Sequence, residues 1–103
     1  MNNIFDNIPL DLNHEVFENI IAKQPIKIER IISKGHSSPP SGWYEQPQQE
    51  WVLLLKGAAI IDFNHQPAVH LQEGDYLTIN AHQKHKVSWT APNIETIWLA
   101  VHF

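Results

Sequence analysis

The sequence predicts an all-β domain, built as an antiparallel sandwich or barrel. Short apolar segments alternate with turn-forming residues along most of the 103-residue chain, and no helical segment separates them. The expected strands are residues 25–33, 50–57, 58–63, 68–71, 75–79, 85–90 and 95–103. Short strands at roughly even spacing, joined by turns, are typical of sandwiches and barrels.

Composition limits the classes of protein that the chain can belong to. Its 43% of hydrophobic residues and four tryptophans are typical of a folded domain rather than a disordered chain. Its 103 residues leave room for one hydrophobic core. The formal net charge is -4 without a basic cluster, so we expect no nucleic-acid partner. The absence of cysteine excludes disulfides, thiolate zinc sites and cysteine nucleophiles. No apolar run approaches the ~20 residues that cross a bilayer and the N-terminus lacks a signal-like core, so we expect a soluble cytoplasmic protein without a membrane partner.

The first 24 residues are expected to form an arm that precedes the barrel, and the barrel takes residues 25–103. A short helix is predicted in the arm, because apolar residues recur there at helical spacing. These residues are Val16, Phe17, Ile20 and Ile21. Asp11 or Asn13 can cap the helix, and Pro25 ends it.

Alternation along two strands points Glu50 and His85 toward the core. His85 shares a face with Val87, while lysines take the other face, and Glu50 shares a face with Val52. A buried carboxylate must be paired, hydrogen-bonded or bound to a metal. An inward histidine is equally well explained by a hydrogen bond to a backbone carbonyl. His82 lies in the turn before His85, where it can swing toward the same cavity mouth or face solvent.

The long segment 34–49 is the one irregular stretch, and loops of this length in a compact domain are often functional. Its aromatic residues, Trp43 and Tyr44, would be poorly explained on a solvated loop. We therefore expect the segment to form the rim of a pocket, with Trp43 or Tyr44 facing the cavity. The histidines at 14, 36, 65, 70 and 102 have no partner at a recognisable spacing, and no role is predicted for them.

The segment "EWVLLLKG", followed further along the chain by "GDYLTINAHQKH", makes the sequence resemble a small single-domain cupin. The first cupin motif is G-x5-H-x-H-x3,4-E-x6-G, and "EWVLLLKG" supplies Glu50 and, after six residues, Gly57. The second is G-x5-P-x-G-x2-H-x3-N, and "GDYLTINAHQKH" supplies Gly74 and His85, with His82 where glycine is usual. The resemblance covers roughly residues 25–103 and implies a double-stranded β-helix, or jelly roll, with a pocket inside the barrel.

The chain departs from the family where the first motif has its two histidines. Counting back from Glu50 with four intervening residues places Trp43 and Glu45 at those positions, and counting with three places Tyr44 and Gln46. The metal-ligand set that matching can assemble is therefore Glu50, His85 and Glu45, with His82 as a further candidate. Trp43, Tyr44 and Gln46 are expected as ligand-binding residues. Mixed carboxylate and imidazole donors suit Mn²⁺, Fe²⁺, Ni²⁺ or Zn²⁺.

Two functions from different classes fit this pattern. One is a divalent-metal enzyme on a small polar substrate, in which the metal polarises a carbonyl or activates water or dioxygen, Tyr44 donates a hydrogen bond and Trp43 stacks on the substrate. The other is a non-catalytic, metal-free cupin that binds or senses a sugar-like or carboxylate molecule. The fold hosts many unrelated functions and cannot choose between them, so the sequence leaves open whether the chain is an enzyme.

A homodimer is also expected, because two strands are apolar on both faces and a barrel interior buries only one face of each. The strand "WVLLL" leaves Trp51, Leu53 and Leu55 to be covered from outside, and "TIWLAVHF" raises the same problem. Exposed apolar patches of this kind usually mark association surfaces, and two-fold pairing is the commonest form of association. The alternative is that the N-terminal arm folds back over them.

Overall fold

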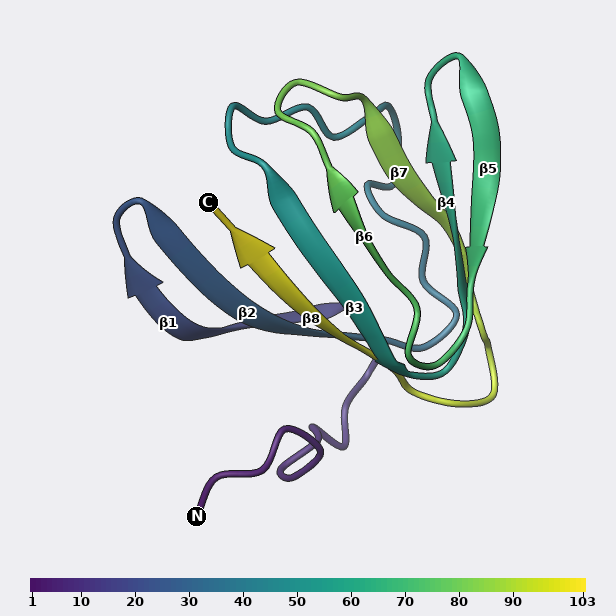
Figure 1. Ribbon diagram of the computed structural model, residues 1–103. Coiled ribbons are helices and arrows are strands. Elements are labelled where there is room, and N and C mark those ends of the chain that lie inside the picture. Colours follow the sequence, from purple (N-terminus) through teal and green to yellow (C-terminus); the bar gives the residue numbers. More distant parts are fainter.

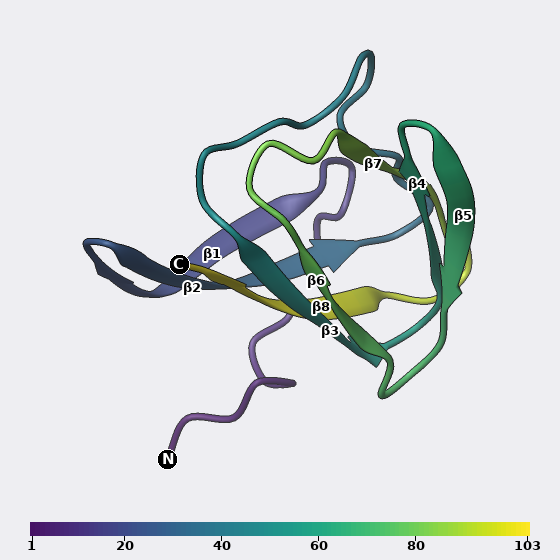
Figure 2. The ribbon, with the colours of Figure 1, turned by 45° about the horizontal axis from the view of Figure 1, so that its top comes forward.

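The computed structural model describes residues 1–103 and contains eight strands in two antiparallel sheets (Figure 1). The strands are β1 (Val16–Lys23), β2 (Ile26–Ser33), β3 (Glu50–Lys56), β4 (Ala59–Phe63), β5 (Gln66–Leu71), β6 (Tyr76–Ile79), β7 (His85–Thr90) and β8 (Thr96–His102). One sheet has the order β1-β2-β8-β3-β6 and the other has the order β5-β4-β7. The sheets face each other as an open barrel (Figure 2), which confirms the all-β prediction. The structure has no helix of the length and apolarity needed to cross a membrane.

The predicted N-terminal helix is wrong, because residues Val16–Lys23 form β1 and pair antiparallel with β2. A bulge between Asn19 and Ile21 shifts the register of this pairing by one residue. The bulge interrupts the two-residue alternation of a strand, so the apolar residues on either side of it lie at spacings that resemble a helical period. The β-branched Val16, Ile20 and Ile21 also favour an extended backbone.

The inside of the barrel changes from apolar to polar along the strands. The apolar part is a cluster of nine buried residues, among them Leu54 of β3 and Trp98 of β8. β8 lies between β2 and β3 in the sheet, and its register pairs His102 with Glu50. Since β3 begins at Glu50 and β8 ends at His102, these two side chains meet at one end of the barrel.

The N-terminal segment, residues 1–15, is held at the outer face of β2 by Arg30, whose side chain is almost fully buried. The guanidinium donates hydrogen bonds to the backbone carbonyls of Ile4 (3.1 Å), Asp6 (2.6 Å) and Asn7 (3.3 Å). It also forms an ion pair with Glu18 of β1 at 2.6 Å. Residues near the start of the chain are therefore held by one arginine through their main chain.

The loop 34–49 runs along β7 and is fixed to it by two pairs of backbone hydrogen bonds. Ser38 exchanges hydrogen bonds with Val87 at 2.9 and 2.8 Å, and Tyr44 exchanges them with His85 at 2.8 and 3.1 Å. The loop thereby extends the edge of the three-stranded sheet beside β7. This arrangement places the loop next to the polar end of the barrel.

Candidate functional site

A cavity of about 330 Å³ lies at the polar end of the barrel and is lined by 16 residues from both sheets, the loop 34–49 and the N-terminal segment. Half of the lining is hydrophobic. The ionisable side chains that line it are Glu15, Lys27, Glu29, Glu50, His85, His102 and the phenol of Tyr44. Such a concave, largely apolar site with a few converging polar groups is typical of small-molecule pockets.

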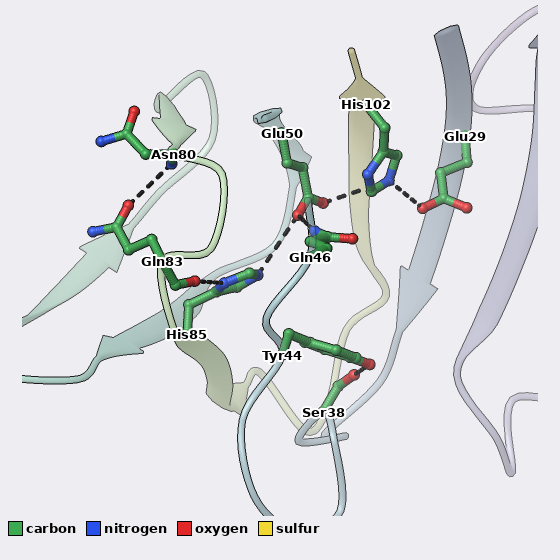
Figure 3. Close-up of polar contacts among 9 residues, drawn as sticks. All are labelled: Glu29, Ser38, Tyr44, Gln46, Glu50, Asn80, Gln83, His85 and His102. Atoms are coloured by element: carbon green, nitrogen blue, oxygen red, sulfur yellow. Dashed lines mark hydrogen bonds and ion pairs between the residues drawn. The ribbon is translucent and has the colours of Figure 1, made fainter. Parts of the chain in front are cut away.

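Glu50 lies at the centre of the polar groups and is only 8% exposed (Figure 3). The side-chain amide of Gln46 donates a hydrogen bond to its Oε1 at 2.8 Å. Nε2 of His85 lies 3.6 Å from Oε1, and Nε2 of His102 lies 3.8 Å from Oε2. Two imidazoles therefore flank one carboxylate without closing onto it.

The orientation of His85 is set by its own backbone neighbourhood. Its Nδ1 contacts the carbonyl oxygen of Gln83 at 2.8 Å, and since a carbonyl only accepts, Nδ1 carries the proton and Nε2 faces Glu50 (Figure 3). Burial disfavours the charged imidazole, but Glu50 and the Gln83 carbonyl outweigh it, so the pKa of His85 is raised above its ordinary value. As alternation along the strands predicts, Glu50 and His85 face the same cavity.

His102 and Glu29 form a second buried pair that the sequence analysis missed. Nε2 of His102 donates to Oε1 of Glu29 at 2.9 Å, and this hydrogen bond holds the pKa of Glu29 below its ordinary value against the opposing effect of burial. The signal was present in the alternation of β8, because His102 shares a face with Trp98 and Ala100. In β2, Glu29 shares a face with Lys27, and this polar face is the one that lines the cavity.

The structure distinguishes the two ways of aligning the first motif. Tyr44 and Gln46 line the cavity together with Glu50 and His85, whereas Trp43 and Glu45 do not line it. This is the register with three residues between Gln46 and Glu50. Tyr44 stands with its ring centroid 5.7 Å from that of His85, and its hydroxyl is hydrogen-bonded to Ser38 (Figure 3). The loop 34–49 thus forms part of the rim, with Tyr44 as its aromatic contact.

The remaining residues that the sequence analysis nominated lie at the surface. Glu45 is exposed, and the ring of Trp43 lies under the ammonium group of Lys86, 4.6 Å from the ring centroid. His82 has a left-handed backbone (φ 63°) and an exposed side chain, and its amide donates to the carbonyl of Gln46 at 2.7 Å. A positive φ favours glycine, which explains why the motif usually has glycine at this position.

The barrel and its polar end match a single family along most of the chain. The chain belongs to the cupin family, because the family model described as "Cupin domain" matches residues 29–102. A comparison with curated proteins found no match.

Solved structures resemble the chain over nearly its whole length. A protein of Ralstonia eutropha JMP134, provisionally described as a mannose-6-phosphate isomerase, is 40% identical with a TM-score of 0.93, over 99% of this chain and 95% of that one. A cupin superfamily protein of Desulfitobacterium hafniense DCB-2 is 21% identical with a TM-score of 0.76, over 93% and 83% of the two chains. An RmlC-like cupin of Methanocaldococcus jannaschii, with a double-stranded β-helix fold, is 14% identical with a TM-score of 0.73, over 93% and 85%. The latter two show the fold alone, and they agree with the jelly-roll prediction.

Cupins commonly bind a divalent metal ion, and the donors of such a site would have to come from this cavity. His85, His102 and Glu50 are the side chains that could supply ligands. No three histidine, aspartate or glutamate side chains lie close enough together to hold an ion, and the Nε2 proton of His102 is engaged by Glu29. The donor set in this arrangement does not fit a divalent metal.

Proposed function

We propose that the chain is a ligand-binding cupin whose barrel holds a small polar organic molecule directly, without a metal ion. The observation that carries this proposal is the position of Glu50, a buried carboxylate at the centre of a cavity that is otherwise half hydrophobic. A buried charge of this kind is costly unless hydrogen-bond donors surround it, and a ligand can supply donors on the cavity side.

The side chains around Glu50 have complementary tasks in this proposal. His85 presents Nε2 to the cavity, and its Nδ1 bond to the Gln83 carbonyl keeps the ring from turning. The Tyr44 hydroxyl and the amide of Gln46 supply further polar contacts from the loop 34–49. The hydrophobic half of the lining excludes water, which strengthens each polar contact that a ligand makes there.

Binding of small probes tests the proposal. We expect at least one of glucose, choline and acetate to bind in titration calorimetry, with amide chemical-shift changes centred on Glu50 and His85. His85→Ala should weaken that binding about tenfold or more, because it removes the Nε2 contact that the ring presents to the cavity. His70→Ala, on the exposed face of β5, is the matched control and should bind as the parent does. Binding that His85→Ala leaves unchanged would contradict the site.

A second candidate is a divalent-metal enzyme that acts on a small polar substrate, with Zn, Mn, Fe or Ni held by His85, Glu50 and His102. It is favoured by one observation, that both imidazoles turn Nε2 toward Glu50. The Ralstonia protein would suggest a sugar phosphate as substrate. However, the only lysine or arginine in the cavity lining is Lys27, against three carboxylates, which makes a poor site for a phosphate group.

Elemental analysis of the purified protein distinguishes the two candidates. We expect much less than one equivalent of Zn, Mn, Fe or Ni per chain, because the donors stand too far apart to chelate an ion. A full equivalent that His85→Ala removes and His70→Ala retains would establish the metal site instead.

A further inference from the structure

The fixed charges around the cavity are mainly negative. Three carboxylates line it, those of Glu15, Glu29 and Glu50, and one lysine does. Lys27 is 43% exposed at its side chain and lies 3.9 Å from Glu29, so its charge is directed to that one carboxylate and to solvent. His102 also engages Glu29. Glu29 therefore has two partners of its own, while Glu50 and Glu15 have no lysine or arginine beside them.

Glu50 keeps one oxygen open to the cavity. Its Oε1 accepts the amide of Gln46, whereas the nearest polar partner of Oε2 is Nε2 of His102, at 3.8 Å and beyond hydrogen-bonding distance (Figure 3). A carboxylate that is 92% buried and has an unfilled acceptor facing a cavity is a strong site for a donor or a positive charge.

Aromatic rings share the lining with these carboxylates. Trp98 of β8, Tyr44 of the loop 34–49 and Phe17 of β1 all line the cavity. Aromatic faces attract cations, most strongly where water is excluded. The Oγ of Ser33 is bonded to Glu15 at the rim, which holds that carboxylate in place.

We propose that this cavity selects a small organic cation, an ammonium group on a compact alkyl body, with Glu50 as its buried counter-ion and Glu15 as a rim charge. The inference rests on the ligand-binding function proposed above and adds the chemical class of the ligand. A sugar-like ligand would use the same acceptors through charge-assisted hydrogen bonds, but it would form no ion pair with Glu50. A carboxylate ligand would meet the like charges of Glu50 and Glu15 and is disfavoured by the same arrangement.

The test compares choline with 3,3-dimethylbutan-1-ol, which has the same shape without the charge, by titration calorimetry on the full chain. Choline is expected to bind about tenfold tighter or more than the alcohol. Glu50→Gln keeps the shape of the side chain and should remove most of the preference, leaving about the threefold share that Glu15 supplies. Glu15→Gln, at the less buried rim, should reduce it about threefold and keeps the test decisive should Glu50→Gln fail to fold. Glu45→Gln removes an exposed carboxylate outside the cavity and should leave the preference unchanged.

The remaining outcomes of these titrations separate charge selection from ligand binding. Equal binding of the alcohol and choline would overturn charge selection, while the ligand-binding function would stand. A preference for choline that survives both Glu50→Gln and Glu15→Gln would overturn the assignment of the counter-ions. Failure of choline, the alcohol, glucose and acetate to bind at all would overturn the proposed function together with this inference.

Discussion

Replacing Gly57 by alanine is expected to lower the free energy of unfolding by about 2–5 kcal/mol, which is the sum of a backbone term of about 1–2 kcal/mol and a packing term of about 1–3 kcal/mol. Gly57 has φ +94°, a conformation that side chains disfavour. An added Cβ would lie 2.8 Å from Cα and 2.9 Å from Cβ of Thr96, and it would also contact the Thr96 hydroxyl. Thr96 is fully buried in β8 and cannot move aside.

Gly42→Ala separates the two terms. Gly42 has a similar φ of +76°, but nothing lies within 4 Å of an added Cβ. This variant should therefore lose only about 1 kcal/mol, the cost of the backbone strain alone. Urea unfolding monitored by tryptophan fluorescence measures both values. Equal losses at the two positions would show that Thr96 is not an obstacle.

Leu53→Glu is expected to convert a dimer into a monomer, because we propose that the outer face of the five-stranded sheet is the surface where two copies of the chain pair. Trp51, Leu53 and Leu55 alternate with the inward residues of β3 and are half-buried within one chain. The N-terminal segment is bound at Arg30 of β2, two strands away from β3 in the sheet. The outer side of β3 therefore needs a different cover, and a second copy of the same face is self-complementary.

Size-exclusion chromatography with light scattering checks the assembly. A charge at Leu53 would be buried between the two copies, and it would be solvated in a monomer, so the variant should remain folded by circular dichroism. Gln66→Glu, on the exposed part of β5, adds the same charge elsewhere and should stay dimeric. A parent protein that is monomeric at tens of micromolar would refute the proposed pairing.

The sequence predicted β2 to β8 but not β1, and alternation alone turned Glu50 and His85 inward. It could not predict His102 and Glu29 as their neighbours, because that contact depends on the order of strands in the sheet. β8 pairs with both β2 and β3, and these three strands come from distant parts of the chain. No pattern within one strand reports which strand lies beside it.

Two further expectations depended on the spacing between residues along the chain. A bulge or an irregular loop changes which side chains a given spacing brings to the same face. The bulge in β1 made a strand look like a helix. In the first motif, spacings of three and four residues were both admissible, and the path of the loop 34–49 along β7 selects Tyr44 and Gln46. The side chains themselves were a poor guide to the spacing. Glutamate is a better metal donor than glutamine, and yet Glu45 faces solvent.

Arg30 binds the start of the chain through backbone carbonyl groups. Every amino acid has this carbonyl, whatever its side chain. The sequence of the segment can therefore drift during evolution while its attachment is retained. The same stretch of chain continues into Glu15 and Phe17, which reach the cavity from outside the region shared with the family, residues 29–102. Under the proposed ligand-binding function, substitutions at Glu15 and Phe17 would therefore change the lining of the cavity without altering the strands that match the family model.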